Sequence, residues 1–275
     1  MKEIPYVRIT KAGSSDGYLT ECWQRRELLW FFARRDLVVR YRQTALGVFW
    51  VLLRPVLAMG IFSFLFGRIA KLDSGGVPYE LIVLTGMISW QYFASVLSES
   101  VGSIANNPTL ITKIYFPRML MPLSSLILNA VDISILGALW LALMIWHGMA
   151  PGFKVILLPI GLLLLFIPVL GVALWTSSLA VRYKDVKSLV PIVLQFGILI
   201  TPVAWSSSVL NGNMKWVSWM NPLSAPVEWV RWSLLPGMPP PEVFSVICSL
   251  LVSTLFTFAG YVQFKRSEAR FADVI

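Results

Sequence analysis

The residues that could do chemistry are few and far apart in this sequence, which has one histidine and two cysteines. General acid–base catalysis needs titratable side chains within reach of one another, and the lone His147 has no such set near it in the sequence. There is no G-x-x-x-x-G-K-S/T loop to cradle phosphates and no Cys/His cluster to bind zinc. We therefore predict that the chain is not an enzyme and has no catalytic, cofactor-binding or metal-binding residues of its own.

Carboxylates within apolar stretches are also rare. Asp132 is inside such a stretch, and Glu80 and Glu99 are near the ends of another. A proton-coupled carrier needs several ionisable groups deep in the membrane, so a single Asp132 supports that class weakly. We expect Asp132 instead to form a hydrogen bond to a neighbouring helix, for example to Gln195.

The segment 106–118 has the composition of a short docking helix. Asn107 can cap a helix that begins at Pro108, and Pro117 would end it. Apolar residues four apart would share one face over about two turns, and such an exposed amphipathic helix fits a groove in another protein. The alternative is a helix that lies on the lipid surface. The candidate partner-binding residues are Pro108, Leu110, Ile111, Lys113, Ile114 and Tyr115.

The elements that would position these residues are apolar runs, each near the length of about 20 residues that a helix needs to cross a bilayer. Of the 275 residues, 57% are hydrophobic and 13% are charged, whereas a soluble domain has about 25% charged residues. The runs lack the alternation of a membrane β-barrel, so we expect helices. The fifth run is the shortest. The six predicted spans are Leu46–Gly67, Tyr79–Gly102, Met119–Trp146, Val155–Val181, Leu189–Trp205 and Val243–Phe264.

The distribution of charge predicts the orientation of these spans. The net charge is +9, and 17 of the 23 Lys and Arg residues lie in the two terminal segments and in the second-to-third and fourth-to-fifth connections. By the positive-inside rule both termini are cytoplasmic. The basic residues therefore indicate membrane orientation rather than nucleic-acid binding. Polar residues continue to Gln43, so we expect no signal peptide.

Two further segments complete the predicted all-α membrane protein. Tyr18–Thr44 mixes aromatic and basic residues, which predicts an amphipathic helix at the membrane interface. Ser206–Glu242 is expected outside, with a re-entrant helix from about Ser224 to Pro236. Arg54-Pro55 predicts either a break in the first run or an arginine that snorkels to the headgroups. The expected organisation is an N-terminal tail with the interface helix at 1–45, a six-span membrane domain at 46–264 and a cytoplasmic tail at 265–275.

A pattern of longer stretches identifies a family. The stretches are RRDLVVRYRQTALGVFWVLLRP (34–55), VPYELIVLTGMISWQYF (77–93), NNPTLITKIYFPRMLMPLSSLI (106–127), VRYKDVKSLVPIVLQFGILITPV (181–203), MNPLSAPVEWVRW (220–232) and FKRSEARFADVI (264–275). The closing SEARFADVI and the central KIYFPR are not features of membrane proteins in general. The pattern resembles the permease subunits of type 2 ABC transporters that export polysaccharides, above all the O-antigen exporters of Gram-negative bacteria. Teichoic-acid exporter permeases are similar, and capsule exporter permeases are more distant.

The resemblance implies a homodimer that binds two copies of a separate cytoplasmic ATPase subunit, which carries the ATP and Mg. The complex would move a polysaccharide linked to a lipid, undecaprenyl pyrophosphate in O-antigen export, across the bacterial inner membrane. The N-terminal helix and the segment 107–115 would contact the ATPase. Arg54 departs from the pattern, which more often has a neutral residue there. The alternatives are a teichoic-acid or capsule exporter permease, a membrane-embedded glycosyl or acyl transferase, and an ion-coupled carrier.

Under this resemblance, aromatic side chains could line the path of the glycan, because the C–H faces of sugar rings stack on aromatic rings. The chain has 12 Trp, 8 Tyr and 16 Phe residues. Trp90, Tyr92 and Phe93 are the candidate path residues, since they cluster near Gly86, where backbones can approach closely. The alternative is an ordinary aromatic belt at the membrane interface.

Overall fold

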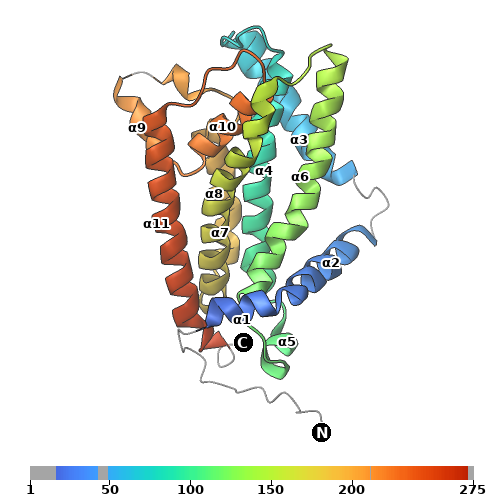
Figure 1. Cartoon of the computed structure of the whole chain (residues 1–275), viewed down its shortest axis with the longest axis vertical. Coiled ribbons are helices and arrows are strands. Elements are labelled where there is room, and N and C mark those ends of the chain that lie inside the picture. Colours follow the sequence, from blue (N-terminus) through green and yellow to red (C-terminus); the bar gives the residue numbers. More distant parts are fainter. Residues whose placement is uncertain (1–16, 43–48, 211, 272–275) are drawn as a thin grey trace.

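The computed structural model describes residues 17–42, 49–210 and 212–271, and these residues form helices joined by turns without any β-strand. Long helices run side by side in an elongated bundle, and α1 and α5 lie at the end opposite α9 and α10 (Figure 1). The predicted all-α fold is confirmed over the described residues. The α-helices are α1 (Tyr18–Gln24), α2 (Arg26–Arg42), α3 (Phe49–Phe62), α4 (Tyr79–Ser103), α5 (Pro108–Lys113), α6 (Leu120–Trp146), α7 (Leu158–Arg182), α8 (Val186–Ile200), α9 (Lys215–Met220), α10 (Ser224–Leu234) and α11 (Val243–Glu268).

Five helical segments in the described residues are long and apolar enough to cross a membrane. They correspond to the first, second, third, fourth and sixth predicted spans. Leu46, where the first span was expected to begin, lies outside the described residues. The chain is therefore a multi-pass membrane protein. The five candidate spans are Phe49–Ile69, Tyr79–Ser103, Leu120–Trp146, Phe153–Arg182 and Val243–Glu268.

The fifth predicted span, Leu189–Trp205, is wrong as a continuous helix. The helix in this region is α8, and its 15 residues reach about 22 Å, short of the hydrocarbon thickness of about 30 Å. Thr201 is extended, with ψ of 139°, because Pro202 disfavours a helical conformation at the residue before it. The chain therefore has a short apolar helix followed by an irregular segment where a full-length span was expected.

The first span differs from the expectation at Arg54-Pro55. Helix α3 continues through Pro55, so the predicted break at this pair is wrong. A π-helix, Ser63–Ile69, follows α3 directly; π-helical turns are rare and often mark functional positions. The Arg54 side chain is exposed on α3, and the alternative interpretation, a cation that reaches toward the headgroups, stays a prediction.

Helix α4 is the centre of the bundle. Its apolar window is 72% buried, against 11% for the window of Phe49–Ile69, and it contacts α3, α6, α7, α8 and α10. A Cβ atom placed on Gly86 would lie 2.1 Å from the carbonyl oxygen of Val203. The most buried of the five candidate spans therefore contacts the irregular segment that follows α8.

Small residues also bring α7 and α11 together. A Cβ atom on Gly260 would lie 2.5 Å from the carbonyl oxygen of Gly171, and the Thr257 hydroxyl donates a hydrogen bond of 2.7 Å to the carbonyl of Ile167. Close approach through small residues and interhelical hydrogen bonds is the usual way in which membrane helices associate. The two helices are thus in backbone contact along part of their length.

The two ends of the bundle separate the basic residues as the sequence predicts. At the α5 end, the Lys187 amine donates a hydrogen bond of 2.9 Å to Asn106. At the opposite end, the Lys154 amine lies 5.3 Å from the ring centroid of Trp232, and Lys215 pairs with Glu242 at 3.6 Å. The connections that the charge argument assigned to opposite sides of the membrane therefore lie at opposite ends of the structure.

The contact at Gly86 generates a prediction for stability. Gly86→Ala forces a methyl group into the backbone at Val203, so we expect a loss of about 1–3 kcal/mol, as for other overpacked sites. Gly137→Ala is the matched control in a membrane helix, because a Cβ atom there meets no atom within 4 Å. Thermal unfolding of the two purified variants in detergent measures the difference. An equal unfolding temperature for both would contradict the close contact.

Candidate functional site

Helix α5 is shorter than the sequence predicts. Pro108 is its first residue, as expected, but the Asn107 side chain donates to the carbonyl of Ser103 at 2.8 Å and caps nothing. The helix ends at Lys113, and Ile114 is extended, with φ of −126° and ψ of 130°. The predicted two turns, with apolar residues paired four apart on one face, are therefore wrong.

The six candidate partner-binding residues divide into an inner and an outer group. Ile111 is only 3% exposed and packs in a cluster with Ile104 and Phe116, so it stabilises this chain's own core. Ile114 is 56% exposed and Tyr115 is 48% exposed. Pro108 and Lys113 are exposed as well, and Leu110 is half-buried. The surface available to a partner is thus formed by exposed residues at the two ends of α5 and not by one face of a helix. These residues are Pro108, Lys113, Ile114 and Tyr115.

Arg25, the residue that follows α1, holds Tyr115 in place at one end of this surface. The Arg25 side chain donates a hydrogen bond of 3.0 Å to the carbonyl oxygen of Tyr115, and its guanidinium carbon lies 5.5 Å from the centroid of the Tyr115 ring. Arg25 also pairs with Glu21 at 3.4 Å, one turn away on α1. The N-terminal helix and the segment after α5 therefore form one continuous surface at this end of the bundle.

The end of α11 joins the same region. Glu268 accepts hydrogen bonds from the Tyr18 hydroxyl at 2.8 Å and from the backbone N–H of Arg118 at 2.9 Å. Burial and the negative charge of Glu268 raise the pKa of Tyr18 above its ordinary value, so the hydroxyl stays protonated as a donor. Phe271 packs edge-on against Phe264. The closing sequence stretch thus ties α1 to the connection between α5 and α6.

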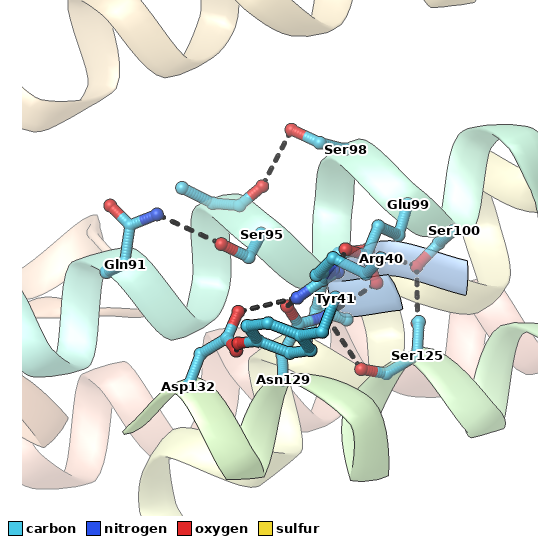
Figure 2. Close-up of polar contacts among 12 residues, drawn as sticks. Arg40, Tyr41, Gln91, Ser95, Ser98, Glu99, Ser100, Ser125, Asn129 and Asp132 are labelled. Carbon is cyan, nitrogen blue, oxygen red and sulfur yellow. Dashed lines mark hydrogen bonds and ion pairs between the residues drawn. The ribbon is translucent and has the colours of Figure 1, made fainter. Parts of the chain in front are cut away.

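A cluster of charged residues attaches α2 to the bundle (Figure 2). Arg40 of α2 forms ion pairs with Glu99 of α4 and with Asp132 of α6, the latter at 2.6 Å. The Tyr41 hydroxyl donates to Asp132 at 2.7 Å, and the Asn129 amide donates to Glu99 at 2.9 Å. Charge-assisted hydrogen bonds of this kind are roughly twice as strong as neutral ones. One arginine therefore links the interface helix to two membrane helices.

This cluster was not predicted from the sequence. The expected hydrogen bond from Asp132 to a neighbouring helix is confirmed, but the suggested partner Gln195 is wrong, because Arg40 and Tyr41 of α2 are the partners. The available signal was the presence of acidic residues in two predicted spans, which require cationic partners in a membrane protein. Burial and the hydrogen bond to Asp132 raise the pKa of Tyr41 to about 12.

Arg54 lies beside this cluster. A cavity of about 300 Å³ is lined by Arg54 together with Arg40, Gln91 and Asp132. Arg40 faces two carboxylates, so the cluster without Arg54 has one excess negative charge. Arg54 offsets that charge across the cavity, which gives a physical reason for a cation at this position.

The three candidate path residues are in the interior of the single chain. Trp90 and Phe93 lie with ring centroids 5.6 Å apart, and a Cβ atom on Gly197 of α8 would lie 2.8 Å from the Trp90 ring. The Tyr92 hydroxyl donates to the carbonyl of Leu126 at 3.3 Å. All three side chains are 9% exposed or less. Their role as path residues stays a prediction, and it requires α4 to separate from α8 or α6.

A second polar cluster lies at the opposite end, around α10. This helix matches the predicted re-entrant element, since it begins at Ser224 and ends before Pro236. Arg231 on α10 is buried, with only 3% of its surface exposed. Glu228 accepts a hydrogen bond of 2.8 Å from the N–H of Ser207. The guanidinium of Arg231 donates at 2.7–3.0 Å to the carbonyl oxygens of Pro202, Val203 and Trp205.

The Arg40 cluster yields a testable prediction. Arg40→Gln leaves Glu99 and Asp132 without their shared cation, so we expect a loss of about 2 kcal/mol, or a decrease of about 4–8 °C in unfolding temperature. Trypsin should also cut α2 more readily. Arg34→Gln is the matched control, because Arg34 is exposed on the same helix. An Arg40 variant as stable and as protease-resistant as the Arg34 variant would show that the cluster does not attach α2.

Comparison with known proteins agrees with this architecture. The family model described as ABC-2 type transporter matches residues 27–235. The chain is 26% identical to the O-antigen export system permease protein RfbA of Klebsiella pneumoniae over 251 residues, which are 90% of this chain and 95% of the relative. It is 27% identical to the protein of the same name from Myxococcus xanthus over 70% of this chain and 73% of that one. It is also 25% identical to the polysialic acid transport protein KpsM of Escherichia coli, over 74% of this chain and 79% of the relative. Because the family model covers most of the chain, from α2 to the end of α10, this protein belongs to the ABC-2 type transporter family as a non-catalytic membrane subunit.

Proposed function

We propose that this chain is the membrane subunit of an ATP-driven exporter that moves a lipid-linked, O-antigen-like polysaccharide across the bacterial inner membrane. The observation that carries the proposal is the similarity to O-antigen export permeases over 90% of the chain. The lipid carrier is undecaprenyl pyrophosphate in this proposal. The family match extends from α2 through α10, so it includes elements at both ends of the bundle.

A cytoplasmic ABC ATPase is the partner that supplies energy in this proposal, and it binds the ATP and Mg. The surface formed by α1 and the exposed residues around α5 is the docking site. It combines apolar side chains, Ile114 and Tyr115, with cations such as Lys113, all of them exposed. Short elements of this kind fit grooves in partner proteins. The fixed position of Tyr115 against Arg25 supports a surface that is already formed before the partner binds.

A second copy of the chain completes the path in this proposal. Helices α3 and α8 are the least embedded helices of the bundle and expose large apolar side chains, among them Leu57, Ile61, Ile192, Phe196 and Leu199. We place the neighbouring membrane subunit against these two helices, because the rest of the bundle buries little of their surface. Trp90 of α4 packs against α8, so movement of α8 in a dimer would expose the aromatic residues predicted to line the glycan path.

A second candidate cargo is a capsule polysaccharide. The relatives named for polysialic acid transport are 25% and 23% identical over 74% of the chain, and this similarity favours capsule export as the alternative to O-antigen export. Teichoic-acid export remains a further candidate from the sequence pattern alone. The membrane-embedded transferase is no longer supported, because members of the ABC-2 family are non-catalytic membrane subunits.

The docking surface generates a prediction that separates association from folding. Ile114→Asp places a charge where an apolar side chain worth about 1.5–3 kcal/mol would be buried against the ATPase, so we expect association to weaken by about 10- to 100-fold. The yield and unfolding temperature of the permease should not change. The measurement is co-purification with the ATPase at several concentrations, together with the amount of glycan at the cell surface.

Ile111→Ala is the matched control for that experiment. Ile111 is buried in this chain, so its truncation should lower permease stability by about 2–5 kcal/mol without the partner present. If Ile114→Asp binds the ATPase as tightly as the parent chain and exports normally, the surface around α5 is not the docking site.

The orientation of the bundle gives a second prediction. With both termini in the cytoplasm, Met214→Cys should react with a membrane-impermeant maleimide in intact spheroplasts, and Lys184→Cys should react only after permeabilisation. Cys248→Ser removes one native thiol. The other can remain, because burial raises the pKa of the Cys22 thiol to about 12, so almost no reactive thiolate forms. Equal labelling at both positions would refute the orientation.

A further inference from the structure

The ends of α7 and α11 enclose a cavity that the proposed function does not use. The helices are in backbone contact at Gly171 and Gly260. Beyond this contact, toward the α1 end of the bundle, a cavity of about 390 Å³ lies between them. Six of its lining residues are polar: Ser178, Arg182, Gln263, Arg266, Ser267 and Arg270.

The described residues that line the cavity have an excess of positive charge, with three arginines and no carboxylate. Within the described residues, none of its three arginines forms an ion pair. The Glu268 side chain, which is close in sequence, is bonded to Tyr18 and Arg118 instead. Cations at helix C-termini also stabilise the helix dipole, but each helix end has only about half a negative charge. Three arginines exceed what two helix ends require, so the cavity attracts an additional anion.

The position of Arg266 on α11 indicates what kind of anion fits. Arg266 follows Leu255 by eleven residues, which returns it to nearly the same helix face, within about 20°. Leu255 and Phe258 are strongly exposed on this candidate span, and Arg270 lies just after the end of α11. An apolar stripe therefore leads along α11 to a basic cavity at its end. A free phosphate would use only the cavity, whereas a lipid would use both the cavity and the stripe.

We propose that this cavity binds the phosphodiester headgroup of an anionic membrane phospholipid, with an acyl chain along the apolar stripe of α11. Guanidinium groups bind phosphate oxygens through paired hydrogen bonds, and basic pockets between membrane helices on the cytoplasmic side bind such headgroups. The side chains of Ser178, Gln263 and Ser267 supply further polar groups beside the arginines. The site requires only that α7 and α11 cross the membrane, so it is independent of the exported cargo.

Native mass spectrometry of the full-length permease in detergent tests the site. The protein is titrated with phosphatidylglycerol and, separately, with phosphatidylcholine of the same acyl chains. We expect tighter binding of phosphatidylglycerol. The double variant Arg266→Gln, Arg270→Gln should bind it about 30-fold more weakly, which corresponds to about 2 kcal/mol. Circular dichroism and the elution volume confirm that the variant is folded.

The control variant is Arg34→Gln, Lys184→Gln, which removes the same charge from exposed positions outside the cavity. It should keep the affinity for phosphatidylglycerol within about twofold, since it removes no contact in the cavity. Equal affinity for both lipids, or undiminished phosphatidylglycerol binding by the cavity variant, would overturn the proposal. So would displacement of the lipid by millimolar inorganic phosphate, or a cavity variant that loses only ATPase association, because these results assign the arginines to a soluble anion or to a protein.

Discussion

The constraint on which this structure depends is that backbone polar groups inside a membrane need partners within the protein, because hydrocarbon offers none. Continuous helices satisfy it along most of the chain. The exception is the segment after α8, where Pro202 ends the helix before it can cross and leaves carbonyl groups without helical partners. The buried guanidinium of Arg231 donates to several of these carbonyls. The guanidinium of Arg231 on α10 thus supplies the hydrogen-bond donors that a longer helix would otherwise have supplied to these carbonyls.

The bonds between Arg231 and the segment after α8 also determine how neighbouring elements pack. The segment held by Arg231 approaches α4 so closely that position 86 has no room for a side chain. The Tyr79 hydroxyl donates to the carbonyl of Ala204 at 2.6 Å, which adds a second contact between α4 and the segment. Burying a charged arginine costs free energy unless its donors are used, and here the backbone carbonyls use most of them. Helix α10, most of whose residues are buried, is therefore part of the core.

Hydropathy alone was sufficient to predict the long helices, because about 20 apolar residues in lipid can form little other than a helix. The limits of α10 were also predictable, since Pro236 ends it. The truncation of α8 was not recognised because its apolar composition continues past Pro202, where the conformation changes. The residues around α5 divide into buried and exposed ones because Phe116, just after the exposed Ile114 and Tyr115, is buried in the core. The sequence pattern did not indicate that burial. The contact of Arg40 with Glu99 and Asp132 joins residues far apart in sequence, and no local pattern specifies that pairing.

The two polar clusters are connected by one helix. Helix α4 carries Glu99, which pairs with α2 at one end of the bundle, and Gly86, which contacts the Arg231-bound segment toward the other. These positions are thirteen residues apart, about 20 Å along a helix. Because α4 is the most buried of the five candidate spans, a shift of α2 transmitted through Arg40 would act on a rigid element rather than on a loop. Helix α3 is mostly exposed and ends in a π-helix, so it can move without disrupting the core. In the proposed ATP-driven exporter, α4 is therefore the element through which motion of α2 can reach the segment held by Arg231.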